Sequence, residues 1–235
     1  MEVHFAVAKI HKYASRESGD TLEMVERPHG GLSMVLVDGQ RSGRSAKVIS
    51  NVVARKAIQL LAEGVRDGAA ARAAHDYLYT YRGGKVSATL NILSVDAITK
   101  TFVISRNNDA PAIVYTENDG LYLLDEASER VGFHRNTKPV ITEIPVMLGT
   151  MIVVFTDGLR HAGSWHGSNG YDPYATMERL LAQQVVDPQV IVDTLLNEAV
   201  ALDNGRPRDD ISVMAMSVLP RGDNEVRRLG GQLPL

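Results

Sequence analysis

The 235-residue sequence contains no cysteine. This absence excludes disulfide bonds, thiolate metal ligands and a catalytic cysteine, and it agrees with a reducing compartment. Long apolar runs are also absent, since the longest extend over only about five or six residues, whereas a membrane-spanning helix needs about 20. The N-terminal residues show no signal-peptide pattern. We therefore expect a soluble, cytoplasmic protein with no membrane association.

Excess positive charge is lacking as well. The chain has 25 Lys and Arg residues against 28 Asp and Glu, for a net charge of −3. A nucleic-acid surface needs a broad basic face, so we expect no nucleic-acid partner. No Pro/Gly/Ser-rich linker divides the chain, and its 44% hydrophobic content is enough for a full core. We expect one domain over residues 1–219 and a mobile, Gly-rich and charged tail over residues 220–235.

Hydrophobic periodicity predicts an alternation of strand groups and helix pairs. Alternating or short apolar runs predict strands, and apolar positions three and four residues apart predict amphipathic helices. Strands in groups separated by helix pairs are typical of α+β layering with antiparallel sheets rather than of a βαβ repeat. The expected strands are 2–10, 21–27, 31–37, 86–95, 101–105, the two arms of a hairpin around 118–120, 140–146, 151–155 and 211–219, and the expected helices are 45–62, 69–81, 174–184 and 188–202.

Four Asp-Gly steps occur, and Asp-Gly is an ordinary turn signal. Asp119 lies between two strand-like runs, which predicts a β-hairpin, and Asp67 separates two Ala-rich helical stretches. Asp38 and Asp157 differ, because each directly follows an apolar β-type run and so sits at a sheet rim. Position alone leaves both a turn role and a site role open for these two. Several such carboxylates converging would suit a hard divalent cation.

The acidic motifs together resemble a known family. In this order and spacing they are similar to the metal-dependent protein serine/threonine phosphatases of the protein phosphatase 2C (PPM) type, in the bacterial SpoIIE-like branch, over about residues 10–219. The resemblance implies a four-layer α-β-β-α sandwich, in which two antiparallel sheets are flanked by helix pairs. The motifs are Arg16-Glu17-Ser18-Gly19-Asp20, Asp38-Gly39-Gln40-Arg41-Ser42-Gly43, Thr156-Asp157-Gly158 and Arg208-Asp209-Asp210.

The resemblance also implies two Mg²⁺ or Mn²⁺ ions as cofactors. Asp38 matches the carboxylate that bridges the two ions, and the Gly39 carbonyl matches a ligand beside it. Asp20 matches a ligand of one ion, whereas Asp157 and Asp209 match ligands of the other. Such ions lower the pKa of a bound water, which attacks the phosphate, and clamp the phosphoryl oxygens, so the implied catalytic residues are Asp38, Asp157 and Asp209. A further residue, Asp210, is expected to orient the ligands rather than bind metal.

Phosphate binding is the least determined part of the expected site. Arg16 lies four residues before Asp20, the spacing of a phosphate-binding arginine in the wider superfamily, and a guanidinium fork suits phosphate. A solvated surface arginine is the alternative, and Arg41 and Arg44, close after Asp38, are rival phosphate contacts. The residues after both site Asp-Gly steps depart from the family pattern, so substrate handling can differ.

A Gly/Ser-rich loop follows the Asp157 motif. His161 and His166 flank Trp165 around this loop, residues 163–170, which could cover the site. Either histidine could shuttle protons near neutral pH. An inert surface loop is the alternative.

The function expected from this resemblance is that of a stand-alone bacterial phosphoserine/phosphothreonine phosphatase in stress signalling. The implied partner is a phosphorylated regulatory protein, either a STAS-type antagonist or a stressosome component, by analogy alone. Two alternatives remain: a degenerate phosphatase fold that only binds a signalling partner, and a hydrolase of small phosphorylated metabolites. All four expected aspartate ligands are present, which argues against the degenerate fold.

Overall fold

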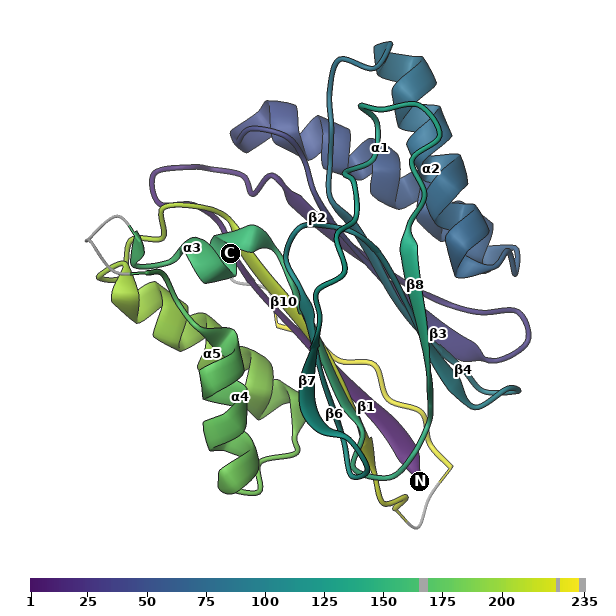
Figure 1. Ribbon diagram of the computed structural model, residues 1–235, viewed down its shortest axis with the longest axis vertical. Coiled ribbons are helices and arrows are strands. Elements are labelled where there is room, and N and C mark those ends of the chain that lie inside the picture. The colour runs from purple at the N-terminus through teal and green to yellow at the C-terminus, as the bar shows by residue number, and fades with distance from the viewer. Residues whose placement is uncertain (165–168, 223–224, 233–235) are drawn as a thin grey trace.

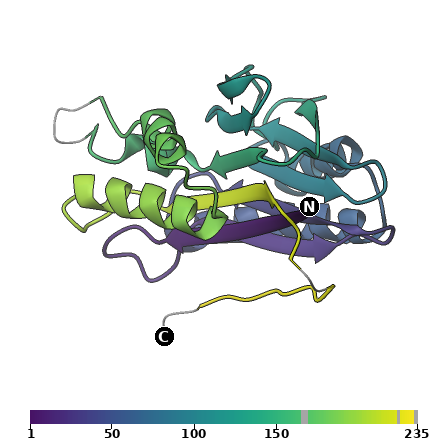
Figure 2. The ribbon, with the colours of Figure 1, turned by 90° about the horizontal axis from the view of Figure 1, so that it is seen from below.

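Two stacked antiparallel sheets form the centre of the protein in the computed structural model, which describes residues 1–164, 169–222 and 225–232. Each sheet carries a helix pair on its outer face, so four layers follow one another across the molecule (Figures 1 and 2). The first sheet has the order β1-β10-β9-β6-β7 and the second β2-β3-β4-β5-β8. This arrangement confirms the expected α+β sandwich.

The strands of the first sheet come from both ends of the chain. The last strand, β10, lies between β1 and β9, so the chain closes this sheet only when it returns from its C-terminal part. The β6–β7 hairpin turns at Asp119, as the sequence predicted. The strands are β1 (Glu2–Ile10), β6 (Ala112–Thr116), β7 (Gly120–Leu124), β9 (Met151–Phe155) and β10 (Ile211–Leu219).

The second sheet is built from sequential neighbours for most of its width. Strands β2, β3, β4 and β5 follow one another in space as in sequence, and β8 joins the edge at β5. Short hairpin connections favour this antiparallel meander. The strands are β2 (Asp20–Glu26), β3 (Gly31–Asp38), β4 (Leu90–Asp96), β5 (Thr101–Asn107) and β8 (Val140–Pro145).

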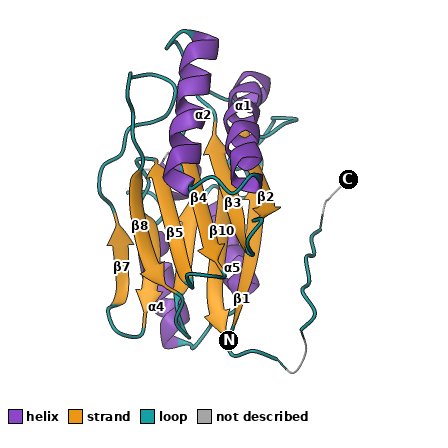
Figure 3. Cartoon of the chain, turned by 90° about the vertical axis from the view of Figure 1, so that its right-hand side faces the viewer, coloured by secondary structure: helices purple, strands orange, loops and turns teal. Residues whose placement is uncertain are grey.

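The helices cover the outer faces in pairs. α1 and α2 pack on the second sheet, whereas α5 packs on β1 and β10 with α4 beside it (Figure 3). A short fifth helix, α3, follows β9 directly. Their bounds are α1 (Gly43–Ala62), α2 (Asp67–Arg82), α3 (Asp157–His161), α4 (Pro173–Ala182) and α5 (Pro188–Leu202).

Three apolar cores hold the four layers together. Strand β3 has a continuously apolar sequence because both of its faces are buried. Met34 and Leu36 face the core between the sheets, while Val35 and Val37 face the core under α1 and α2. Successive strand residues point to opposite faces, so a strand buried on both sides needs an apolar residue at every position. The third core lies between the first sheet and helices α4 and α5.

The structure adds one helix to the expected elements and shifts the ends of several others by one to four residues. Strand β4 begins at Leu90 rather than at residue 86, because Ala88 forms isolated bridges with Gly39 and Val131 instead of joining the ladder. Helix α3 was not expected. Helix α2 begins at Asp67, whose carboxylate accepts a hydrogen bond from Arg27 at 2.8 Å, so this residue joins a helix to the β2–β3 hairpin.

Two other expectations concern the C-terminal tail and the loop after Asp157. The described residues after β10 form no helix or strand and run along the outside (Figure 3); the expected mobility of this tail stays a prediction. Trp165 and His166 of the expected covering loop lie outside the described residues. Within the part of the chain that is described, no helix has the length and apolarity to cross a membrane.

Candidate metal centre

Four aspartates from different segments gather at one end of the sandwich. Asp20 begins β2 and Asp38 ends β3, and the two are register partners in the second sheet. Asp157 directly follows Thr156 at the end of β9, and Asp209 lies two residues before β10. Because β9 and β10 are antiparallel neighbours, these two also meet at one end of the first sheet, where Asp157 begins α3. Ligand candidates from both sheets thus face the same seam.

Asp20 joins the two sheets at this seam. Its side chain is only 1% exposed, and its Oδ2 accepts hydrogen bonds from Ser212 Oγ at 2.6 Å and Thr156 Oγ1 at 3.1 Å. Burial raises the pKa of Asp20 to about 6, and the charge of Asp210 adds to this effect. The other carboxylate oxygen, Oδ1, is buried without a hydrogen-bond partner. A buried oxygen of this kind calls for a ligand.

Asp38 lies at the centre of the acidic group. Burial raises the pKa of its carboxyl group to about 9, and the charges of Asp20, Asp157 and Asp209 contribute further. Burial likewise raises the pKa of Asp209, where Asp157 is the nearest unfavourable side-chain charge. Like charges in a poorly solvated place repel unless a cation joins them. The group therefore needs either protons or positive ions.

Arg130 supplies part of the positive charge. Its Nη2 donates to Asp157 Oδ2 at 3.3 Å and its Nε donates to Asp109 Oδ2 at 3.2 Å. The same guanidinium lowers the pKa of Asp38 through its charge, which opposes the rise caused by burial. One arginine therefore serves two carboxylates directly and a third at longer range.

Two lysines add positive charge beside the backbone of Asp20. Lys9 Nζ and Lys47 Nζ both donate to the main-chain oxygen of Asp20, at 2.6 and 2.7 Å. Burial and the neighbouring Lys47 lower the pKa of Lys9 to about 8. Two ammonium groups on one carbonyl fix the first residue of β2 tightly. They hold the backbone from which the Asp20 carboxylate projects.

The glycines of the two site Asp-Gly steps have a different role from that of a turn glycine. Gly120 of the hairpin has φ +72° and open space around its Cα, as a turn requires. Gly39 and Gly158 are not among the glycines with positive φ. A Cβ at Gly39 would lie 2.1 Å from Ala46 O, and one at Gly158 would lie 2.1 Å from the main-chain oxygen of residue 210. Both glycines therefore permit close packing of backbones behind an aspartate.

The Gly39 carbonyl is left free by the local pairing. In the bridge between Gly39 and Ala88, the hydrogen bonds run from Gln40 N to Ser87 O and from Thr89 N to Asp38 O. This is the non-hydrogen-bonded position of an antiparallel pair, so the ladder does not use the Gly39 carbonyl. It remains available as an oxygen ligand.

Asp210 ties two segments of the chain together through its carboxylate. Its Oδ1 accepts from Lys12 N at 3.0 Å and its Oδ2 accepts from Gly19 N at 2.8 Å. The side chain is buried. Both carboxylate oxygens are thus committed to backbone donors that lead into β2.

Replacing Asp210 with alanine is expected to destabilise the fold by roughly 2–4 kcal/mol, because two backbone N–H groups lose their acceptor. Activity should fall by roughly 10–100-fold, as for residues that orient metal ligands. Urea unfolding in chelator measures the first effect without a contribution from metal. Asp96→Ala is the matched control: Asp96 also accepts two backbone N–H bonds, from Ile98 and Thr99, but at an exposed turn where water can replace it. Equal losses in both variants would contradict a special role for Asp210.

The available donor atoms are all oxygens, which divalent cations such as Mg²⁺ and Mn²⁺ prefer. They comprise a buried carboxylate oxygen without a partner, a free carbonyl and three further carboxylates whose mutual repulsion a cation would relieve. Among the described residues, however, no three acidic or histidine side chains already lie close enough to hold an ion. The carboxylates are close enough for their charges to shift the pKa of Asp38, but they do not surround a common point as the ligands of one ion would.

The expected phosphate contacts form no ion pair with the carboxylates of the seam in the described part of the chain. Arg16 and Arg41 are both exposed, and within the described residues neither forms a hydrogen bond or an ion pair. Arg41 has φ +78°, in a turn that leads into α1. His161 is exposed at the end of α3, near Asp209, where both line a small pocket.

Arg130 is the site residue that sequence reasoning missed. Its position depends on Val131, which exchanges two backbone hydrogen bonds with Ala88, and on Gly132, whose N–H donates to His75 Nδ1 at 2.9 Å. Ala88 also pairs with Gly39, so one alanine places the arginine beside Asp38. No local motif around residue 130 signals this long-range pairing.

Comparison with known proteins gives relatives of one kind. The family model described as Stage II sporulation protein E (SpoIIE) matches residues 28–219. Stage II sporulation protein E of Priestia megaterium is 21% identical over 213 residues, which are 90% of this chain and 36% of that protein. The Bacillus subtilis (strain 168) protein of the same name is 19% identical over 201 residues, 86% of this chain and 24% of that one. The chain therefore spans about a quarter to a third of these relatives.

Solved structures show the same fold. The PP2C phosphatase domain of SpoIIE from Bacillus subtilis, with a fragment of its regulatory domain, has TM-score 0.75 and 18% identity, over 93% of this chain and 63% of that one. The catalytic domain of the serine/threonine phosphatase PstP, in complex with two manganese ions, has TM-score 0.68 and 15% identity, over 93% and 99%. A chain solved in work on the bacterial stressosome has TM-score 0.70 and 14% identity, over 92% and 100%.

Proposed function

The chain belongs to the Stage II sporulation protein E (SpoIIE) family, and from this premise we propose that it is a metal-dependent protein serine/threonine phosphatase. It would hydrolyse phosphoserine and phosphothreonine in a bacterial regulatory protein by attack of water. The observation that carries the proposal is the meeting of Asp20, Asp38, Asp157 and Asp209 at the seam, where three charges act on Asp38. Such a group needs protons or cations at neutral pH, and its oxygen donors suit divalent cations.

The proposed cofactors are two Mg²⁺ or Mn²⁺ ions. Asp38, Asp20, Asp157, Asp209 and the Gly39 carbonyl would hold them, all through hard oxygen atoms. When bound, the ions would lower the pKa of water and offset the charge of the phosphate. The manganese-bound relative PstP supports this choice.

The protein's own cations complete the proposed site. Arg130 contacts Asp157 with one arm of its guanidinium, and its remaining donors suit two phosphate oxygens. Its side chain is 34% exposed, so a substrate can reach it. We assign it the phosphate contact that the sequence suggested for Arg16 or Arg41. Lys9 and Lys47 hold the Asp20 backbone and do not face the substrate in this proposal.

The proposed substrate is a phosphorylated STAS-type antagonist or a stressosome component. The similarity to a chain from work on the stressosome supports it. A small phosphorylated metabolite is a weaker fit, because the site lies at an open sheet end beside shallow pockets rather than in an enclosed cavity.

Removal of divalent metal is expected to abolish activity, since the proposed oxygen ligands only hold the ions and cannot themselves activate water. The test measures phosphate release from a phosphothreonine peptide and from p-nitrophenyl phosphate, with Mn²⁺, with Mg²⁺ and with EDTA. Turnover should return when Mn²⁺ is added back. Full activity in EDTA would overturn the mechanism.

The same measurement separates the alternatives. Turnover of the small ester without the peptide would favour a metabolite hydrolase. No turnover of either substrate in Mn²⁺, with the fold intact by circular dichroism, would favour a degenerate fold that only binds its partner.

A further inference from the structure

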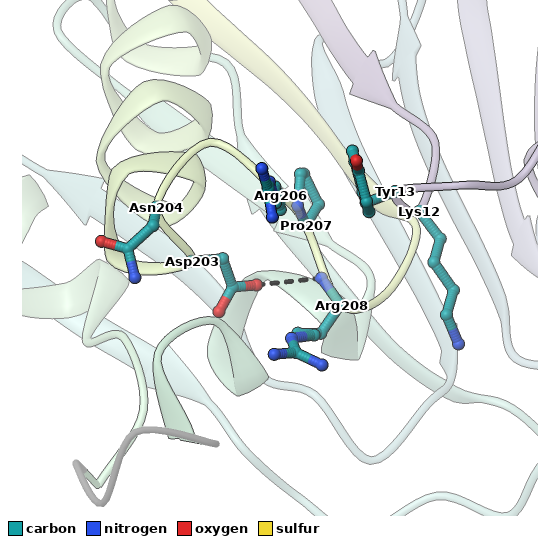
Figure 4. Close-up of a pocket in the computed structure, with 7 residues that line it drawn as sticks. All are labelled: Lys12, Tyr13, Asp203, Asn204, Arg206, Pro207 and Arg208. Carbon is teal, nitrogen blue, oxygen red and sulfur yellow. Dashed lines mark hydrogen bonds between the residues drawn. The ribbon is translucent and has the colours of Figure 1, made fainter.

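Two adjoining pockets run outward from the candidate metal centre. The inner one, of about 320 Å³, reaches Asp209 and Gly158, and the outer one, of about 590 Å³, lies between α5 and the segment after β1. They share Lys12, Asp203 and Arg208, so they adjoin, and the two together are here named the basic groove. Figure 4 shows the residues that line the outer pocket. The basic groove leads from the site of the proposed chemistry to the surface.

The rim of the basic groove is a fixed structure. Tyr13 N donates to Pro207 O at 2.8 Å, which joins the segment after β1 to the loop before β10. The buried Asp203 accepts from Gly163 N at 2.9 Å and from Arg208 N at 3.0 Å; Figure 4 shows the second bond. These bonds hold the groove residues in place before any ligand arrives.

Positive charge dominates this rim. Lys12, Arg206 and Arg208 all line it, and none of them forms a salt bridge within the described residues. Arg206 lies over the Tyr13 ring, with its guanidinium carbon 5.2 Å from the ring centre, which orients it without neutralising it. Two carboxylates also line the groove: Asp203 already accepts two backbone N–H bonds, and Asp209, a proposed metal ligand at the inner end, feels the charge of Lys12. In a chain of net charge −3, three unpaired cations around a depression indicate an anionic ligand.

We propose that the basic groove binds acidic side chains that flank the phosphorylated residue of the protein substrate. The proposal rests on the proposed phosphatase function, and it names a substrate class: phosphoproteins with aspartate or glutamate near the phosphosite. The inner pocket ends at Asp209, so a peptide whose phosphate lies at the metal centre can place neighbouring residues against Lys12 and Arg208. Residues further along the peptide reach Arg206.

An acidic peptide fits the groove better than a nucleic acid does. The cations form one compact cluster beside the site, whereas a nucleic-acid surface needs a stripe of basic residues along the phosphate backbone. Opposite charges at a rim contribute mainly to selection between partners. The groove thus serves as a filter for substrate sequence.

The test compares two phosphothreonine peptides that differ only in flanking residues, Asp and Glu in one and Asn and Gln in the other. The wild-type protein should favour the acidic peptide by about 3- to 30-fold in kcat/KM at low salt, as expected for one or two exposed charge pairs. Arg206→Glu should abolish this preference and leave hydrolysis of p-nitrophenyl phosphate within about twofold. High salt should reduce the wild-type preference.

Arg55→Glu is the matched control. Arg55 is an exposed arginine of α1, on the other side of the sandwich, and the variant makes the same charge change. Its preference should equal that of the wild-type protein. Anisotropy of labelled versions of both peptides measures binding in parallel, so the groove is tested even if no substrate is turned over.

Three outcomes would overturn the proposal. The first is equal turnover and binding of the two peptides by the wild-type protein while p-nitrophenyl phosphate is hydrolysed, which leaves the phosphatase function standing. The second is an equal loss of preference in Arg55→Glu, which would reflect net charge alone. The third is binding of a thymidine oligonucleotide that Arg206→Glu removes, without discrimination between the peptides. Failure to hydrolyse any phosphoester would instead count against the phosphatase function.

Discussion

Replacing Asp38 with asparagine is expected to abolish phosphoester hydrolysis and, in the absence of metal, to stabilise the fold. The loss should exceed about 10³-fold, because Asp38 is the residue proposed to hold both ions, and without them nothing would lower the pKa of the attacking water. The gain in stability follows from charge. The pKa of Asp38 is raised to about 9, mainly by burial and then by three neighbouring carboxylates, so asparagine removes an unfavourable ionisation.

The pH dependence gives the sign of this stability effect. A carboxyl group whose pKa is about 9 in the folded state and near 4 in the unfolded chain binds more protons when folded. Its stabilising contribution is therefore complete below about pH 4 and is lost as the pH rises toward 9. Thermal unfolding in EDTA at pH 5, 7 and 9 should show the metal-free wild-type protein losing stability with rising pH, and Asp38→Asn losing less.

Asp119→Asn is the control for this experiment, since it changes the same residue type at the hairpin turn. It should leave activity unchanged and should not raise metal-free stability. Mn²⁺ should stabilise the wild-type protein at pH 8 and have little effect on Asp38→Asn. If Asp38→Asn keeps substantial activity, or lowers metal-free stability at pH 8, Asp38 is a structural aspartate rather than a metal bridge.

Replacing Arg130 with alanine is expected to lower kcat/KM by roughly 10²–10³-fold, the range for loss of a donor that stabilises developing charge. Arg130→Lys should recover only part of this, because an ammonium group cannot make two parallel contacts with phosphate. Arg16→Ala and Arg41→Ala are the comparisons. Both side chains are exposed, and we expect changes of less than about fivefold.

Metal affinity separates two roles for Arg130. If it binds phosphate, Mn²⁺ affinity in Arg130→Ala should stay the same or increase, since a positive charge next to Asp157 has been removed. If it only positions Asp157, affinity should fall together with activity. A silent Arg130→Ala with a damaging Arg16→Ala or Arg41→Ala would return the phosphate contact to the position that the sequence suggested.

Periodic elements could be predicted from the sequence because their packing is repetitive. The alternate burial of Val35 and Leu36 in β3 illustrates this, since an apolar run there reflects burial on both faces. Helix α3 has only five residues, too few to show a helical period. The start of β4 shifted because Ala88 pairs with Val131, a partner 43 positions away along the chain that no local pattern reveals.

In the candidate site, too, some residues could be predicted from the sequence and others could not. Asp38 and Asp157 could be proposed because each follows a strand, whereas Asp20 and Asp209 were proposed through the family resemblance. The structure brings the four together, and their binding of metal stays a prediction.

The sequence around Gly39 and Gly158 does not distinguish them from Gly120 of the hairpin turn. In the structure they differ from it in φ and in the backbone that packs against them. Arg130 could not be found, because tertiary pairing alone defines its place.

The central position of β10 has a consequence for synthesis of the chain. Until residues 211–219 leave the ribosome, the edge strand β1 lacks β10, its neighbour in the sheet, and is left unpaired, and β9 lacks the neighbour that β10 provides on one side. Two strand edges then stay open to mispairing while the second sheet, made of earlier and more local hairpins, can already form. Asp209 also arrives only at this stage. A nascent chain therefore gains the complete set of carboxylates in the same step that closes its first sheet, and a chain cut short before β10 would carry both exposed edges and an incomplete site.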